Sequence, residues 1–227
     1  MRVLACSMLC MSGAVSDMGA QVRSGVINVG DARLHYEMSG TGPALVFVNG
    51  WALNLRGWDD QVAAFSPRYR VIRYDARGFH KSSGPADRSA EPDDLRILLD
   101  SLGVRTAYVV GLSRGSLVAA DFAVRWPERV NALVLYAVGP TPDFPMPPEG
   151  RAVPNFGAIA RAHGLDSVMK SIAASPLSWR PPDRPDIDQR VARAMEGYDG
   201  RDLLDPRPES GRVKRSTVEE IAQLRIP

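Results

Sequence analysis

The sequence predicts an α/β fold with a mostly parallel sheet. From residue 44 to residue 138, short apolar runs alternate with stretches that carry apolar residues at helical spacing, which is the pattern of consecutive βαβ units. The run at 44–48 is continuously apolar, as expected for a parallel strand that helices cover on both faces. The 227 residues, 44% of them hydrophobic and 24% charged, are enough for one domain with a full core.

The first predicted element is a β-hairpin, because two alternating segments flank a Gly30-Asp31 turn. A helix is predicted from Pro92 to Leu102, since proline opens it, acidic side chains occupy its first turn and glycine follows it. The other predicted elements are strands at 44–48, 70–74, 106–110 and 132–138, and helices at 57–65 and from about 115 to 126.

The composition changes after Gly139, because residues 140–208 hold twelve of the 18 prolines. Such a segment cannot form the interior of a sheet. We expect an irregular helical insertion over the open edge of the sheet, a candidate lid. Its helical patches lie at 156–163, 167–174 and 187–195. A last helix at 217–224 is predicted to begin with a capping box of Thr217 and Glu220.

The chain is therefore expected to divide into a core and an insertion. We predict an α/β core at 21–139, a cap or lid at 140–216 and the start of a C-terminal core part at 217–227. Residues 1–20 are either an N-terminal extension or a weak secretory signal peptide, because one basic residue precedes a short apolar stretch and an Ala-x-Ser end. We expect a cytoplasmic protein, or an exported one if this signal is used.

Composition and charge exclude several classes of protein. The net charge is +2 and the basic residues are spread along the chain, so no nucleic-acid partner is expected. No segment approaches the ~18 apolar residues that a membrane span needs. The two cysteines, Cys6 and Cys10, lie outside the predicted core and provide neither a disulfide framework nor a CxxC metal site. We expect no metal and no cofactor.

A GxSxG segment lies where a predicted strand meets a predicted helix. It runs from Gly111 to Gly115 with Ser113 at its centre. In that setting the pattern is typical of a nucleophile elbow, a sharp and strained turn that pushes the serine hydroxyl out above the sheet. Ser113 is therefore the candidate nucleophile.

Acyl transfer by a serine also needs N–H donors for the developing oxyanion. In an elbow, one donor is the backbone N–H of the residue after the serine, here Arg114. The other comes from the loop after the third strand, and we expect the backbone N–H of Trp51, since Gly50 allows a close approach. The alternative for Asn49-Gly50 is an ordinary turn.

Four blocks together resemble the α/β-hydrolase superfamily: the elbow, Val46 to Trp51, Tyr74 to Ser82, and Trp126 to Val130. The resemblance covers residues 25–140 and points to bacterial members of the enol-lactonase and esterase kind. It implies an α/β-hydrolase fold, a serine nucleophile and a small ester or lactone substrate.

In similar proteins the block after the fourth strand is structural, and Asp75, Arg77 and Ser82 match it. The chain departs from the family elsewhere. The oxyanion loop begins with Asn49 where His is usual, Leu112 precedes the nucleophile where His is frequent, and Ser116 and His80 stand at glycine positions. These departures concern rate and substrate fit.

The resemblance also implies a triad in the order Ser, acid, His, with the His in the last loop. Residues 217–227 are similar to the lead-in to the strand that presents the acid, and about 50 residues of strand and helix would follow it. We therefore expect a C-terminally truncated form, with the last strands missing and no counterpart of the triad histidine.

Other residues could substitute for the missing groups. His35 lies in a predicted strand and is expected to be structural, whereas His80 lies in a loop at the correct edge of the sheet. His163 belongs to the insertion, where a solvent-facing position is the simpler expectation. Asp143 matches a position where some relatives carry their acid, although a turn residue is the alternative.

Two functions follow from these residues. One is a serine hydrolase of ester or lactone bonds, which uses Ser113 and two backbone donors. The other is a catalytically impaired remnant or a binding module that keeps the pocket without the chemistry. Dehalogenation needs an Asp nucleophile, and Ser113 argues against it. An apolar sixth strand at the sheet edge also predicts self-association.

Overall fold

The computed structural model describes residues 22–137, 155–174, 184–206 and 218–227. The predicted extension at 1–20, Asp143 and Thr217 of the expected capping box lie outside these residues. Among the described helices, none has the length and apolar character that crossing a bilayer requires.

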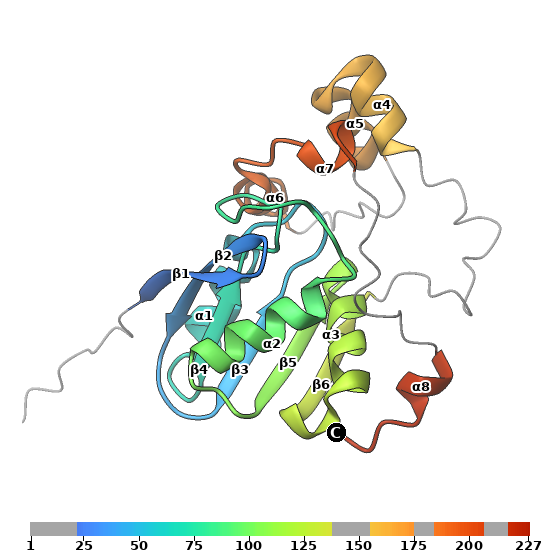
Figure 1. The fold of residues 1–227 in the computed structure, drawn as a ribbon. Helices are drawn as coiled ribbons and strands as arrows, with labels where there is room; N and C mark the ends of the chain where they lie inside the picture. The colour runs from blue at the N-terminus through green and yellow to red at the C-terminus, as the bar shows by residue number, and fades with distance from the viewer. Residues whose placement is uncertain (1–21, 138–154, 175–183, 207–217) are drawn as a thin grey trace, which may run out of the picture.

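Six strands form one sheet in the order β1-β2-β4-β3-β5-β6 (Figure 1). β3 pairs in parallel with β4 and β5, and β5 pairs in parallel with β6. The hairpin β1–β2 adds two antiparallel strands on the β4 side. The strands are β1 (Arg23–Val29), β2 (Ala32–Ser39), β3 (Ala44–Val48), β4 (Arg70–Tyr74), β5 (Ala107–Leu112) and β6 (Val130–Tyr136). The mostly parallel α/β sheet is thus confirmed.

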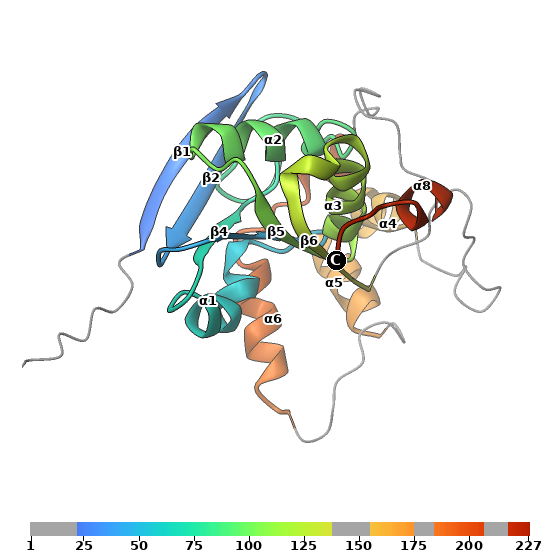
Figure 2. The same ribbon diagram turned by 90° about the horizontal axis from the view of Figure 1, so that it is seen from below.

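Helices cover both faces of the sheet (Figure 2). α2 (Glu91–Ser101) and α3 (Arg114–Arg125) lie on one face, with the short α8 (Val218–Ala222) beside α3. On the other face a 3-10 turn, η1 (Leu55–Trp58), leads into α1 (Asp59–Phe65). A second 3-10 turn, η2 (Pro127–Arg129), precedes β6.

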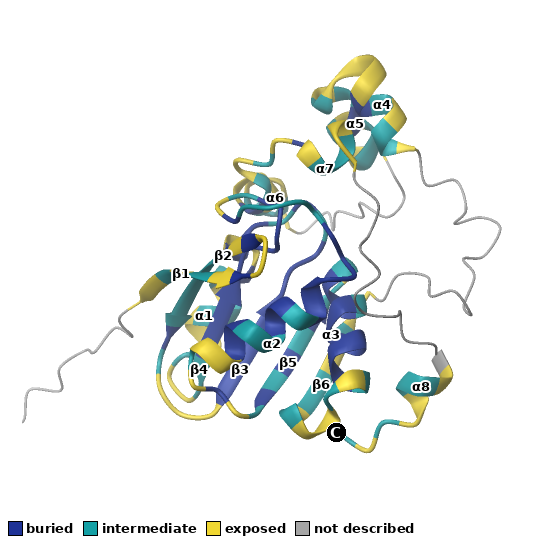
Figure 3. Ribbon diagram, in the orientation of Figure 1, coloured by how far each residue is buried: buried dark blue, intermediate teal, exposed yellow. Residues whose placement is uncertain are grey.

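β3 shows why its sequence is continuously apolar, because all five of its residues are buried (Figure 3). Val46 and Val48 belong to the larger core cluster, which includes residues of α2 and α3. Leu45 and Phe47 point to the opposite face, where the Phe47 ring stacks on Trp58 with 4.5 Å between ring centroids. A strand with one polar face would leave one of these two cores incomplete.

The bounds of the elements around Ser113 differ from the predicted ones. β5 extends to Leu112, two residues beyond the predicted end, and pairs with β6 as far as Tyr136. α3 begins at Arg114. A single residue therefore separates strand from helix, and that residue is Ser113.

The insertion contributes α4 (Phe156–His163), α5 (Leu165–Ala173), α6 (Ile187–Met195) and α7 (Arg201–Leu204). That these helices form a lid over the open edge of the sheet stays a prediction for the described ones. They contact loops at the carboxyl ends of β3 and β4: the Asn54 backbone N–H donates to the Ala194 carbonyl at 2.6 Å, and its side chain donates to the Arg193 carbonyl at 2.9 Å. The placement of α6 thus involves hydrogen bonds to a loop, and the apolar spacing of the sequence gives no information about such bonds.

The β6 edge is partly covered by the last residues of the chain. The Leu133 backbone N–H donates to the Pro227 carbonyl at 2.9 Å, and Leu224 and Ile226 pack against the core. Val134 and Tyr136 remain 53% and 67% exposed. The predicted self-association through this edge stays a prediction.

A buried ion pair joins the turn after β4 to α2. The fully buried Arg77 guanidinium donates to both carboxylate oxygens of Asp94, at 2.6 and 2.8 Å, and also to Asp31 at 3.0 Å. Asp75 and Ser82 are likewise engaged in structural contacts: Asp75 accepts from the Leu55 N–H at 2.9 Å, and the Ser82 hydroxyl donates to the Asp75 carbonyl at 2.7 Å.

Removing the Arg77 charge is expected to destabilise the fold strongly. Arg77→Met leaves the Asp94 carboxylate buried without its partner, which costs about 3–5 kcal/mol of the free energy of unfolding measured in urea. Arg96→Met is the matched control, because the partly exposed Arg96 pairs with Asp100 on the surface of α2 and should lose less than about 1 kcal/mol. Equal losses in the two variants would show that Arg77 has no special structural role.

Candidate active site

Ser113 occupies a strained turn between β5 and α3. Its φ of 51° and ψ of −114° lie in a region that L-residues rarely adopt, at a cost of about 1–3 kcal/mol. Its backbone N–H donates to the Tyr136 carbonyl at 2.8 Å, and its carbonyl accepts from the Ser116 N–H at 2.9 Å. The residue itself is exposed. The fold therefore stabilises an unfavourable backbone conformation that leaves Ser113 open to solvent.

The glycines of the elbow are required by close backbone contacts. A Cβ on Gly111 would lie 2.5 Å from the Gly115 carbonyl oxygen. A Cβ on Gly115 would overlap the carbonyl oxygens of Val48 and Asn49, the latter at 2.5 Å. The helix after the elbow thus packs directly on the end of β3.

Ser116 stands where the family more often has glycine, and the structure gives it a role. Its buried hydroxyl lies 2.7 Å from the Gly111 carbonyl oxygen and 2.8 Å from that of Tyr136. The hydroxyl is thus within hydrogen-bond distance of one carbonyl at the end of β5 and one at the end of β6. This departure from the family pattern is compatible with a formed elbow.

The loop after β3 lies against the elbow. A Cβ on Gly50 would be 3.4 Å from the Leu112 carbonyl oxygen. The Asn49 side chain donates to the Tyr74 carbonyl at 2.8 Å and accepts from the Trp58 indole at 2.6 Å. Asn49, which replaces the usual His, is therefore held on both sides. Within the described part of the chain, the backbone N–H groups of Trp51 and Arg114 donate to no acceptor.

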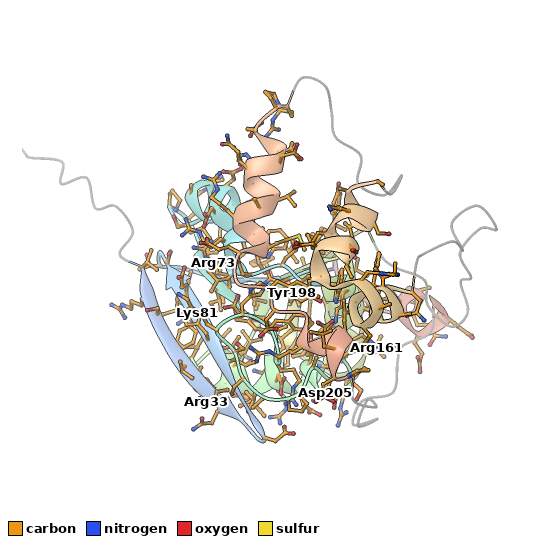
Figure 4. All side chains as sticks on the ribbon, turned by 90° about the horizontal axis from the view of Figure 1, so that it is seen from above. Arg33, Arg73, Lys81, Arg161, Tyr198 and Asp205 are labelled. Atoms are coloured by element: carbon orange, nitrogen blue, oxygen red, sulfur yellow. The ribbon has the colours of Figure 1, made fainter. Side chains whose placement is uncertain are left out.

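The Trp51 side chain is held by the insertion. Its indole N–H donates to Asp202 of α7 at 2.7 Å. Its ring stacks on Phe156 of α4, with 5.6 Å between centroids and 4° between planes, and meets the edge of Tyr198 at 5.6 Å. Figure 4 shows Tyr198 between α6 and the helices α4 and α5. The loop that carries Trp51 is thus anchored from the core and from the cap.

The Arg114 side chain turns toward α2 and pairs with the carboxylate of the buried Glu91. Its guanidinium also lies 5.2 Å from the centre of the Phe79 ring. Burial opposes the charge of Arg114, but Glu91 raises the pKa of the guanidinium above its usual value. Burial raises the pKa of Glu91, and Arg114 counteracts that effect. The Arg114 guanidinium is thus paired with Glu91, whereas the Arg114 backbone N–H has no acceptor among the described residues.

The candidate bases lie apart from Ser113 or are engaged elsewhere. His35 lies on β2 with its Nδ1 3.4 Å from an Asp75 oxygen, and His163 is exposed on α4 as expected. The two ring nitrogens of His80 approach the carbonyl oxygens of Ala52, at 3.1 Å, and Glu196, at 3.2 Å. Among the described residues, no histidine contacts the Ser113 hydroxyl through a hydrogen bond.

Sequence reasoning missed the residues that hold the loop after β3 from the cap. These residues are Phe156, Tyr198 and Asp202, and Asn54 of the loop itself donates to a carbonyl of α6. Trp51 and Asp202 are 151 positions apart, and no local pattern links two side chains at that separation. The amphipathic spacing of the insertion predicts helices but not the loop on which they dock.

Residues 43–190 match the alpha/beta hydrolase fold family, and the chain belongs to that family. One similar protein is a 2-hydroxy-6-oxononadienedioate/2-hydroxy-6-oxononatrienedioate hydrolase of Burkholderia vietnamiensis, 39% identical over 63% of this chain and 53% of the relative. Another is 3-oxoadipate enol-lactonase 2 of Acinetobacter baylyi, 30% identical over 74% of this chain and 65% of the relative. The chain spans about half to two thirds of the length of these relatives.

Solved structures agree with this assignment. The enol-lactonase from Burkholderia xenovorans LB400 superposes with a TM-score of 0.65 and 25% identity over 79% of this chain and 70% of the other. A hydrolase from Pseudomonas aeruginosa gives a TM-score of 0.63 and 29% identity over 77% and 67%. The α/β-hydrolase fold that the sequence resemblance implied is therefore confirmed.

The contact between the elbow and β3 predicts a large cost for adding one methyl group. Gly115→Ala would place its Cβ against two carbonyl oxygens, and we expect a loss of at least about 1–3 kcal/mol in the free energy of unfolding.

Gly57→Ala is the control, because its Cβ would meet only Ala194, at an ordinary 3.6 Å. Its stability should stay within about 0.5 kcal/mol of the parent protein. A Gly115→Ala variant as stable as Gly57→Ala would contradict the close approach of the two backbones.

Proposed function

We propose that this protein is a serine hydrolase that acts on ester or lactone bonds, with Ser113 as its nucleophile. The observation that carries the proposal is the strained, exposed turn of Ser113 at the carboxyl end of β5, directly against the loop 49–51. Strain of this kind is typical of functional sites. The strand-turn-helix setting is the context in which GxSxG acts as a nucleophile elbow.

In the proposed reaction, the Ser113 oxygen attacks the carbonyl carbon of the substrate. The carbonyl oxygen becomes an oxyanion, which accepts hydrogen bonds from the backbone N–H groups of Trp51 and Arg114. Collapse of this intermediate expels the alcohol and leaves an acyl-serine, and water then releases the acid. The two amides are suited to this task because neither has another acceptor among the described residues.

The proton of Ser113 needs an acceptor. Asp143 remains the candidate acid of the site, and it lies outside the described residues. Since no described base contacts Ser113, we expect slow acylation. Oxyanion donors and binding without a base can still give an acceleration on the order of 10³-fold over water.

The substrate class is proposed from the relatives. One relative is named as an enol-lactonase, and another, 37% identical over 48% of this chain, is named as a pimeloyl-[acyl-carrier protein] methyl ester esterase of Nitrosomonas europaea. A small ester or lactone would fit a site whose donors are two backbone amides and whose surroundings at Trp51 are aromatic.

A binding module without turnover is the second candidate function. It is favoured by one observation, namely that the histidines in the described part of the chain make no hydrogen bond to Ser113. Under this reading an ester analogue raises the melting temperature of the protein, but an activated ester is hydrolysed no faster than in buffer.

The proposed function is tested with p-nitrophenyl acetate. Because p-nitrophenyl acetate is an activated ester and an acetyl-serine is not, even slow acylation should outpace deacylation. The parent protein should then release a burst of p-nitrophenolate equal to the concentration of active sites, and Ser113→Ala should abolish it because the acyl acceptor is gone. Ser101→Ala removes an exposed serine at the end of α2 and should leave the burst unchanged. Equal release by the parent protein and Ser113→Ala would refute a role for Ser113.

A further inference from the structure

Asp202 binds two aromatic side chains with its two carboxylate oxygens. Oδ2 accepts from the Trp51 indole N–H at 2.7 Å, and Oδ1 accepts from the Tyr198 hydroxyl at 2.7 Å. Burial raises the pKa of Tyr198, and the hydrogen bond to Asp202 raises it further. The hydroxyl therefore stays protonated and donates at neutral pH. This arrangement fixes the carboxylate that holds the Trp51 indole.

The loop beyond Trp51 has a backbone conformation that needs support. Ala52 has a φ of 61° and His80 a φ of 48°, both in the left-handed region that favours glycine. The Ala52 carbonyl lies 3.1 Å from His80 Nε2, so the two strained residues meet. A loop of this kind relaxes when its outer contacts are removed. Asp202 binds the side chain of Trp51, the residue directly before the strained Ala52.

We propose that Asp202 is a positioning residue, which acts through the Trp51 indole to hold the Trp51 backbone N–H in the oxyanion site. The inference rests on the proposed function. An oxyanion donor is effective only when its position is fixed before the reaction begins, to within about 0.5 Å. Asp202 supplies that constraint from the cap, whereas Asn49 and Gly50 supply it from the core.

The Asp202 carboxylate also affects a second residue of the proposed site. Its charge acts on the Arg114 guanidinium and helps to raise the Arg114 pKa. Asp202 thus faces both residues whose amides are proposed to bind the oxyanion. A hydrogen-bonding role and a charge role therefore have to be separated by experiment. Asn at position 202 keeps an acceptor for the indole and loses the charge, whereas Ala loses both.

Three variants separate these roles. Asp202→Ala removes the acceptor, Asp202→Asn keeps one, and Trp51→Phe removes only the indole donor while the backbone N–H and an aromatic ring remain. Asp202 is only partly buried and lines a groove of about 320 Å³. Asp199→Ala is the matched control, because it removes one acidic group from the same segment, where Asp199 pairs with Arg201.

The acylation rate constant and the apparent dissociation constant for p-nitrophenyl acetate are measured from the burst of each variant. We expect Asp202→Ala and Trp51→Phe to acylate about 10- to 100-fold more slowly, since complete loss of an oxyanion donor costs about 10²–10³-fold. Ester binding should change less than about twofold. Asp202→Asn should recover most of the rate, and Asp199→Ala should match the parent protein.

A second readout follows the contact itself. In protein labelled with 15N-tryptophan, the indole N–H signal that Trp51→Phe removes should shift in Asp202→Ala and stay near its place in Asp202→Asn and Asp199→Ala. If Asp202 only stabilised the fold, Asp202→Ala would lower the melting temperature, and the acylation rate constant would not fall selectively relative to ester binding.

Acylation of Asp202→Ala at the parent rate overturns the inference, as does an Asp202→Asn variant as slow as Asp202→Ala, which would assign the effect to charge. A parent protein without a Ser113-dependent burst overturns the proposed function and the catalytic role of Asp202 together. An indole signal that does not move in Asp202→Ala shows that Asp202 does not hold Trp51.

Discussion

The close approach of two backbone segments is the constraint on which the site depends. The end of β3 and the first turn of α3 touch through atoms that leave no space for a side chain at Gly115, and Gly50 comes close to Leu112 in the same region. Parallel pairing of β3 with β5 places both loops at the same edge of the sheet. Glycines then allow the remaining approach, and Ser113 takes the strained conformation that connects β5 to α3. The candidate nucleophile and the candidate oxyanion donors are thus brought together mainly by backbone geometry.

The cap completes this arrangement. Asn54 binds carbonyls at the end of α6, the His80 ring nitrogens lie 3.1 and 3.2 Å from the Ala52 and Glu196 carbonyl oxygens, and Trp51 contacts side chains from α4 and α7. Each of these contacts ends on a loop at the carboxyl end of β3 or β4. The placement of α4, α6 and α7 and the conformation of the loop after β3 are therefore linked by direct contacts.

Much of the core could be predicted because its signals are local. The strands β3 and β4 have the predicted bounds, and all five residues of β3 and the last four of β4 are buried. The sharp turn at Ser113 could be predicted because both glycines that the turn requires lie within the five residues of the GxSxG motif. The end of β5 could not, because Gly111 becomes a strand residue through pairing with β3 and β6, and Leu112 through pairing with β6.

The contacts of the cap could not be predicted for a different reason. The bounds of α4 and α6 agree with their apolar spacing, but the partner of a helix depends on hydrogen bonds between distant residues. Asp202 and Trp51 meet across 151 positions, and the carboxylate of Asp202 has no feature in the sequence that distinguishes it from its acidic neighbours. Arg114 is similar, because its position after the nucleophile is informative, whereas its pairing with Glu91 is visible only in three dimensions.

The central claim is that the fold makes Ser113 a reactive nucleophile, and covalent labelling tests it most directly. The folded protein is treated with a fluorophosphonate, digested, and analysed by mass spectrometry to locate the adduct. The account predicts one adduct per chain, on the peptide that contains Ser113, and its loss when the protein is unfolded before labelling. A folded protein that takes up no fluorophosphonate, or that is labelled on other serines to the same extent, would contradict it.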